Sequence, residues 1–240
     1  MKRLIETIKN IWKIEDLRKR ILTTLGLILV YRLGSMICLP GIDPSQLQAL
    51  QDQTSSGVLG LLDMFSGGAF SNASVLALGI MPYISASIVV QLLGMAIPYF
   101  QRLQKEGESG RRKINQITRY LTVIILLLQA PSYIANLHAQ LPPSAFIIKG
   151  TFFMIQSVVI LTAGTMFVMW IGERITERGI GNGISIIIMI GIIARLPFAI
   201  TSEFISRIEE QGGGMVMFLI ELVMLAAVIV FVIQIGRAHV

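Results

Sequence analysis

Charged residues are scarce in this sequence. Only 14% of its 240 residues are Asp, Glu, Lys or Arg, whereas 54% are hydrophobic. A typical soluble domain carries about 25% charged residues. The sequence also contains long uncharged apolar runs, and a run of about 20 such residues can cross a bilayer as a helix. These features exclude an ordinary soluble domain and predict an all-α polytopic membrane protein.

Residues that could support catalysis or bind a metal are also scarce. Cys38 is the single cysteine, so the chain can form no internal disulfide and has no CxxC motif. The two histidines, His138 and His239, lie outside the expected spans, and neither HExxH nor GxSxG occurs. We therefore expect no enzyme, no metal site and no cofactor, because the roles of nucleophile, base and metal ligand are unfilled.

The basic residues are unevenly distributed between the connections of the expected helices. Seven Lys or Arg lie in residues 1–20 and six in residues 98–119, whereas none lies in residues 40–74. The positive-inside rule therefore places the N-terminus in the cytoplasm. Residues 1–20 form an amphiphilic segment that is too charged for a cleaved signal peptide. The apolar runs predict six spans, near residues 21–39, 75–97, 118–137, 144–172, 180–200 and 215–234.

The basic segments have two interpretations, and the sequence carries a net charge of +6. They can orient the protein and contact lipid headgroups. They can also dock an anionic partner such as a ribosome.

One stretch, residues 57–91, does not fit a simple span or loop. It reads GVLGLLDMFSGGAFSNASVLALGIMPYISASIVVQ and passes through Gly67, Gly68 and Gly79 into an apolar helix. Its first part is too short and glycine-rich to cross a bilayer alone, and too apolar for a solvated loop. Broken backbone at membrane depth persists only inside protein or along a water-filled cavity. The stretch therefore predicts a pore with an element lying in it.

Two ionisable residues, Arg32 and Glu221, fall within expected spans. Charges at membrane depth are functional candidates. Arg32 can instead snorkel toward the outer interface, and the two residues can pair and neutralise each other. A proton-coupled transporter could also use Glu221.

Five motifs stand in order along the chain: YRLGS from Tyr31, LPGID from Leu39, LGIMPYISASI from Leu78, KEGESGRRK from Lys105 and GERITERGIGNGISIII from Gly172. Together they closely resemble the SecY family, the channel subunits of the bacterial Sec protein translocon. The resemblance covers residues from about 15 to about 233. It implies a SecY-like helix bundle with ten spans in two pseudo-symmetric halves of five. Residues 21–200 would be the first half, and residues 201–234 an outer loop and the sixth span.

The resemblance also implies roles for particular residues. An apolar pore ring would contain Ile80, Ile84, Ile184 and Ile188. A plug over residues 57–70, from Gly57 to Phe70, would contain Leu59, Leu61, Leu62, Met64, Phe65, Gly67 and Gly68, the two glycines allowing a hinge. A lateral gate would use a polar stripe of Ser85, Ser87 and Gln91, with Gln129 as a neighbour. Cytoplasmic partners would contact Arg111, Arg112, Lys113, Arg174 and Arg178.

Each role has a simpler alternative. Isoleucines four residues apart share a helix face, and from spacing alone they indicate ordinary helix packing. The plug could be an amphipathic helix at the outer interface, and the polar stripe could make simple interhelical hydrogen bonds. The glycines of GIGNG indicate a tight turn, because no strand precedes them and no Walker lysine follows.

By resemblance, the chain would act in the bacterial plasma (inner) membrane as a subunit that conducts unfolded polypeptides and inserts membrane proteins. The implied partners are SecE and SecG, SecA and the ribosome at the cytoplasmic face, signal sequences and nascent polypeptides, and the lipid bilayer. The alternative from another class is a small-solute secondary transporter, which also uses broken helices.

The final residues, 235–240, depart from the family pattern. They read IGRAHV, where a long basic cytoplasmic loop is expected. We interpret them as a non-native tail, encoded by read-through of a sequencing adapter, and expect the natural sequence to continue.

Overall fold

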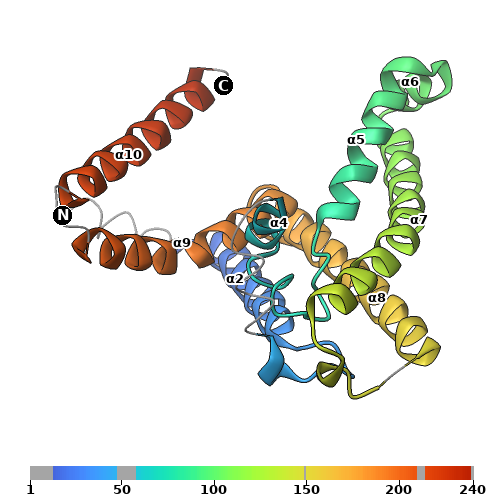
Figure 1. Ribbon diagram of the computed structural model, residues 1–240. Helices are drawn as coiled ribbons and strands as arrows, with labels where there is room; N and C mark the ends of the chain where they lie inside the picture. Colours follow the sequence, from blue (N-terminus) through green and yellow to red (C-terminus); the bar gives the residue numbers. More distant parts are fainter. Residues whose placement is uncertain (1–12, 48–57, 149, 210–213, 239–240) are drawn as a thin grey trace. The chain divides into compact units, whose positions relative to one another are not determined.

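The computed structural model describes residues 13–47, 58–148, 150–209 and 214–238. Within these ranges the regular structure is helical, with two isolated bridges, Cys38 to Ser74 and Ile42 to Phe146 (Figure 1). The predicted all-α class is confirmed. The helices are α2 (Glu15–Met36), η1 (Pro44–Gln46), α4 (Val58–Ser66), α5 (Met81–Ala96), α6 (Pro98–Lys105), α7 (Glu108–Gln140), η2 (Pro143–Ala145), α8 (Thr151–Arg178), α9 (Gly183–Glu209) and α10 (Gly214–Ala238).

The chain divides into two compact units, Met1–Ile192 and Ile193–Val240, and α9 runs through the boundary. In the second unit, the rings of Phe204 and Phe218 meet edge to face with centroids 5.5 Å apart. The described side chains of α10 are mostly exposed and apolar, as a membrane-crossing helix requires. The residues assigned to the ring, plug and gate, where described, belong to the first unit.

Four of the described helices are long and apolar enough to cross a membrane, namely α7, α8, α9 and α10. α5 and α6 together would make a fifth, although the pair is bent by 100°. The bend falls at Ile97, which is extended (φ −112°, ψ 122°) because it precedes Pro98. α2, which covers most of the predicted span 21–39, is not among these helices. Its last 18 residues carry three cationic side chains, Lys19, Arg20 and Arg32.

Helix boundaries differ from the predicted spans where proline and glycine interrupt the chain. α5 begins at Met81 rather than near residue 75, with Pro82 in its first turn and Gly79 at φ +53° before it. Proline suits the first helical turn, and a left-handed φ favours glycine. α8 begins at Thr151 rather than near residue 144, because the turn η2 precedes it. Conversely, the predicted basic loop is helical over α6 and the start of α7.

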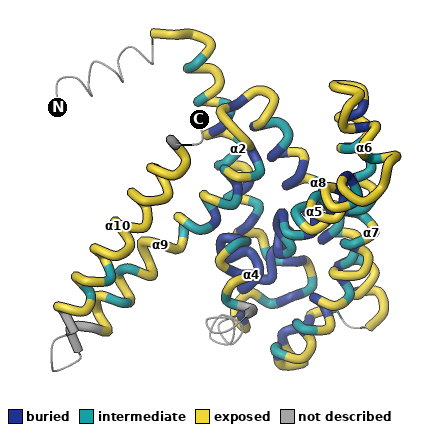
Figure 2. The backbone as a smooth tube through the Cα atoms, turned by 90° about the horizontal axis from the view of Figure 1, so that it is seen from above, coloured by how far each residue is buried: buried dark blue, intermediate teal, exposed yellow. Residues whose placement is uncertain are grey.

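The first unit contains two hydrophobic clusters. One joins the end of α7, the start of α8 and the loops around them through Phe70, Tyr133, Phe146 and Phe153. The other joins α2, α5, α8 and α9 around Tyr31, Leu76, Ile80, Val168, Ile171, Ile175 and Ile187. Figure 2 shows the buried backbone gathered around α4 and the segment that follows it. The core therefore surrounds the stretch that the sequence marks as broken.

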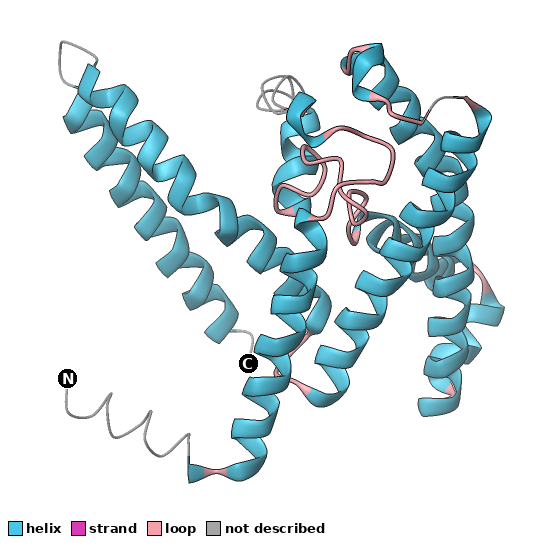
Figure 3. Cartoon of the chain, turned by 90° about the horizontal axis from the view of Figure 1, so that it is seen from below, coloured by secondary structure: helices cyan, strands magenta, loops and turns pink. Residues whose placement is uncertain are grey.

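Residues 67–80, which we name the buried connection, link α4 to α5 without forming a helix (Figure 3). None of its residues is exposed. Successive turns satisfy part of its backbone, for example Ser74 N to Ala69 O at 3.0 Å and Gly79 N to Leu76 O at 2.8 Å. A buried backbone without partners would cost several kcal/mol per group in an apolar medium. The turns are therefore what allow this segment to stay inside the protein.

The loop after α2 supplies further partners for the buried connection. Leu39 N donates to Ala73 O at 2.8 Å, and Val75 N donates to Ile37 O at 3.0 Å. On its other side the connection lies against α8, where a Cβ added at Gly164 would overlap the carbonyl oxygen of Val75. Gly164 is therefore required by close packing rather than by its backbone angles.

We predict that Gly164→Ala lowers the thermal stability of the purified chain, because the new Cβ must displace backbone. Overpacking of this kind typically costs about 1–3 kcal/mol. The matched control is Gly26→Ala in α2, where a Cβ meets nothing within 4 Å and alanine favours the helix. Melting of both variants in the same detergent, followed by circular dichroism, checks the prediction. Equal melting temperatures for the two variants would contradict it.

Candidate functional site

The four predicted ring isoleucines lie in or against one hydrophobic cluster. Ile80 is 3% exposed and belongs to that cluster, while Ile84, Ile184 and Ile188 are partly buried and pack against it. Ile80 precedes α5, but its carbonyl accepts from Ile84 N at 3.1 Å, so the two share the first turn. Residues far apart in sequence are thus brought together, and their role as a pore ring stays a prediction.

Sequence reasoning missed the residue of α9 that is most deeply buried in this cluster. Ile187 is 1% exposed and lies one turn after Ile184. The signal in the sequence was the run of three isoleucines at positions 186 to 188. Three consecutive isoleucines show no helical periodicity, so the sequence does not indicate which of them is buried. The choice of Ile184 and Ile188 came from the family motif alone.

A tight turn between α8 and α9 positions Ile184, as the glycine-rich motif predicts. Asn182 Oδ1 accepts from Ile184 N at 3.0 Å, and Thr176 Oγ1 accepts from Gly183 N at 2.8 Å. The turn is fixed to α2 because Thr24 Oγ1 accepts from Ile180 N at 3.2 Å. A Cβ at Gly183 would overlap the carbonyl of Gly172, so the two helices meet backbone to backbone.

The predicted plug corresponds to α4 and the first residues of the buried connection. Leu61 and Met64 are 56% and 43% exposed, and Phe65 is half-buried. Gly57 and the side chains of Leu59 and Leu62 lie outside the described residues. The rest of the predicted plug, from Ser66 to Phe70, is buried. Only the helical part of the predicted plug therefore presents a loosely packed surface.

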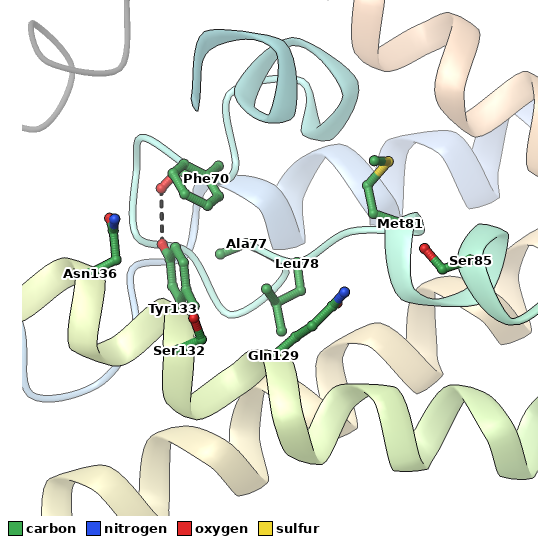
Figure 4. A pocket seen from close by; sticks show the side chains of 9 residues that line it. All are labelled: Phe70, Ala77, Leu78, Met81, Ser85, Gln129, Ser132, Tyr133 and Asn136. Carbon is green, nitrogen blue, oxygen red and sulfur yellow. Dashed lines mark hydrogen bonds between the residues drawn. The ribbon is translucent and has the colours of Figure 1, made fainter. Parts of the chain in front are cut away.

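Three side chains from neighbouring helices hold the end of α4 and the start of the buried connection. Tyr31 OH donates to Ser66 O at 3.2 Å, and Arg32 Nη1 donates to Gly67 O at 2.7 Å. Tyr133 OH donates to Phe70 O at 2.9 Å, the bond that Figure 4 shows as a dashed line. The sequence could not predict these three bonds, because a side chain that donates to a backbone carbonyl needs no particular residue type as its partner.

Asp63 is a fully buried acidic residue in α4. Its Oδ1 accepts from Ser71 N at 2.8 Å, and its carbonyl accepts from Gly68 N at 3.0 Å. Gly67 and Gly68 both have positive φ, +66° and +91°. Their conformation agrees with the predicted use of glycine, while a hinge motion stays a prediction.

The predicted gate stripe is divided between two pockets. Ser85 and Gln129 line one of about 280 Å³, together with Tyr133 and Asn136 (Figure 4). Ser87 and Gln91 line a second pocket of about 700 Å³. Residues two apart on an α-helix point about 200° apart, so Ser85 and Ser87 lie on different faces of α5, and the role of these residues as a gate stays a prediction. Gln129 lines the same pocket as Ser85.

The second pocket is lined mostly by polar residues and opens beside the basic segment. Gln91 Nε2 donates to Ser87 Oγ at 3.4 Å, and Gln104, Arg111 and Asn115 line the facing wall. Pocket walls therefore come from α5, α6 and α7. This arrangement places one predicted gate pair next to one predicted partner-contact residue.

The predicted partner-contact residues are mostly exposed. Arg111, Arg112 and Lys113 lie in the first turns of α7, and Arg178 ends α8. Arg112 lies 3.9 Å from Glu108, and Arg174 Nη1 lies 3.2 Å from Glu177 Oε2. Exposed pairs of this kind contribute about 0–1 kcal/mol, so both cations stay available to a partner.

Glu173 forms an ion pair outside its own helix. It accepts two bonds from Arg119, at 3.0 Å and 2.6 Å, which join α8 to α7. Across the described residues no three His, Cys, Asp or Glu side chains are grouped to hold a metal. Pairing of Arg32 with Glu221 stays a prediction.

Comparisons with known proteins give one consistent family. The family model described as SecY matches residues 74–240. Protein translocase subunit SecY of Streptomyces scabiei is 46% identical over 241 residues, covering 94% of this chain and 54% of the relative. The subunit of the same name from Escherichia coli (strain K12) is 47% identical over 219 residues, covering 91% and 48%. The chain thus spans about half the length of the curated relatives it matches.

Among solved structures, one described as Sec61 in the canine ribosome-channel complex from the endoplasmic reticulum is similar to this chain. The TM-score is 0.47 with 18% sequence identity, and the match covers 74% of this chain and 36% of that one.

We predict that Tyr133→Phe destabilises the chain by about 1–2 kcal/mol, because the buried carbonyl of Phe70 loses its donor. Phenylalanine retains the ring, whose centroid lies 4.9 Å from that of Phe70, so packing is largely preserved. Tyr120→Phe is the control, since Tyr120 is 72% exposed. Urea titration of both variants in detergent measures the difference, and a Tyr133→Phe midpoint equal to that of the control would contradict the expected role.

Proposed function

The chain belongs to the SecY family, and we propose that it supplies the first half of a channel that conducts unfolded polypeptides across a membrane and releases membrane helices into lipid. The observation that carries the proposal is the buried connection, which lies against a cluster containing or contacting Ile80, Ile84, Ile184 and Ile188. A bundle of packed helices does not need a non-helical segment buried beside its isoleucine cluster, whereas a pore with a plug does.

A ring of branched aliphatic side chains suits a protein-conducting constriction. It forms a narrow dry passage that gates by dewetting. It offers no fixed polar partner, so it favours no particular translocating sequence. Ile84, Ile184 and Ile188 are only partly buried, which supports a surface that faces an opening rather than a closed core. In the proposed channel, the second half would supply the remaining side of the ring.

α4 would be the plug that closes the outer side of this ring. Its exposed Leu61 and Met64 give it an apolar surface with few partners, as an element that leaves its seat requires. α5 and α7 would form one side of the lateral gate. Ile88, Leu92 and Leu128 expose apolar surface there, and Ser85 with Gln129 supplies modest polar contacts.

The multi-pass chain would lie in the bacterial inner membrane with its N-terminus in the cytoplasm. Arg111, Arg112, Lys113, Arg174 and Arg178 would then face the cytoplasm and contact SecA or the ribosome. SecE and SecG would be further subunits of the complex. The positive-inside distribution supports this orientation, and the exposure of these cations supports the docking role.

Family membership favours the channel over the alternative of a small-solute transporter. A transporter of that class binds its substrate with defined groups near the midplane. Here the side chains gathered at the broken segment are mainly isoleucine and valine. The channel itself would catalyse no reaction, and energy for translocation would come from SecA or the ribosome.

We expect a photo-reactive amino acid at Ile80 or Ile184 to crosslink to a stalled secretory polypeptide. The experiment uses the chain joined to the second half of the Escherichia coli relative and assembled in membrane vesicles. A photo-reactive residue at Val159, which is 61% exposed on α8, is the control and should give no crosslink to a secreted chain. Assembly is checked by co-purification with the partner subunits. Absence of crosslinks at both isoleucines in an assembled complex would overturn the proposal.

A further inference from the structure

Two consecutive residues of α2 donate to two consecutive carbonyls at the end of α4. Tyr31 OH reaches Ser66 O at 3.2 Å, and Arg32 Nη1 reaches Gly67 O at 2.7 Å. Ser66 is the last residue of α4, and Gly67 follows it at φ +66°. The two donors therefore meet the C-terminal end of the helix, where carbonyls lack intrahelical partners.

Electrostatics favour a cation at this position. The C-terminus of a helix carries a partial negative charge, and a positive side chain near it is stabilising. Hydrogen bonds from a charged donor are roughly twice as strong as those between neutral groups. Tyr31 is a neutral donor, although it is 1% exposed and water cannot readily replace its bond. Because Arg32 is charged and Tyr31 is not, Arg32 is expected to hold the end of α4 more strongly.

Gly67 also packs against a glycine of α9. A Cβ added at Gly67 would lie 2.9 Å from Arg32 Nη1 and 2.9 Å from the Cα of Gly191. A Cβ added at Gly191 would lie 2.9 Å from the carbonyl oxygen of Phe65. The end of α4 therefore packs closely against a guanidinium and bare backbone, and a side chain on either glycine would disturb this fit.

We propose that Tyr31, Arg32 and Gly191 form a latch that fixes the end of α4 in its seat, with Arg32 as the main positioning residue. The proposal rests on the proposed function in that α4 is taken as the plug. It assigns the cation in α2 a definite role, in place of snorkelling or pairing with Glu221. Because Leu61 and Met64 are exposed, release of α4 would depend on loss of the bonds to Ser66 and Gly67.

The test measures the position of α4 by double electron–electron resonance. Spin labels are placed at Met64 on α4 and at Leu128 on α7, both exposed, in a Cys38→Ser background in lipid nanodiscs. Arg32→Met removes the charge and every donor while keeping the apolar length. Arg32→Lys retains the charge, and Tyr31→Phe removes only the neutral donor. Arg18→Met alters an exposed cation of the same helix and is the control.

We expect the population with displaced α4 to rise roughly tenfold in Arg32→Met, given the usual strength of a hydrogen bond to a charged group. Arg32→Lys should give a smaller rise, Tyr31→Phe a smaller one still, and Arg18→Met none. A distance distribution for Arg32→Met that matches the unaltered chain would overturn the latch. A protein that has merely unfolded would also lose helicity by circular dichroism, whereas displacement of α4 alone would not.

A second measurement separates the latch from the channel assignment. The same Arg32→Met change is made in the chain joined to the second half of the relative, and ion conductance across a planar bilayer is recorded. Displacement of α4 with raised conductance supports both proposals. Displacement without a change in conductance supports the latch and counts against the plug and channel roles. Unchanged position of α4 overturns the latch, whatever the conductance.

Discussion

The structure depends on one constraint, which is that a non-helical backbone away from water must find its hydrogen-bond partners inside the protein. The buried connection, residues 67–80, meets this constraint with its own turns, with the loop after α2, and with side chains of α2 and α7. These partners come from the connection itself, from the loop after α2, and from the helices α2 and α7. The buried connection therefore links the surrounding helices to one another, and these helices in turn hold the connection in place.

The same constraint explains where glycine and tyrosine occur around the connection. Gly164 and Gly191 let helices α8 and α9 approach its backbone, because a Cβ at either would press on a carbonyl. Tyr31 and Tyr133 bring an apolar ring and one hydroxyl donor, which suits an apolar site with a single carbonyl to satisfy. Because the break ends at Gly79, Ile80 is placed at the start of α5 beside α9.

Much of this architecture was predictable from the sequence. Low charge and long apolar runs indicated a membrane bundle, and glycines at 67, 68 and 79 indicated a broken element. The ordered motifs identified the family. Boundaries were less predictable: the apolar pattern from residue 75 continues into α5, so hydropathy alone could not show that the helix begins at Met81. Proline at 82 was the available signal for that start.

Partners across the fold were the least predictable part of the site. The bond from Arg32 to the carbonyl of Gly67 depends on where the backbone of Gly67 lies, which cannot be predicted from residue types. Arg119 likewise reaches Glu173 across 54 residues, although Glu173 has closer cations in its own helix. The division of the predicted gate residues between two pockets has a simpler reason. Ser85 and Ser87 lie on different faces of α5, and each faces its own pocket.

The most direct test of this account is hydrogen–deuterium exchange of the chain in lipid nanodiscs, followed by mass spectrometry. Peptides covering residues 67–80 should exchange as slowly as peptides from the middle of α8, because their amides are buried and many are bonded within the protein. Exchange of residues 67–80 at the rate of an unstructured peptide would contradict the account. It would mean that the segment is not held among the helices, and the seat proposed for α4 would be lost with it.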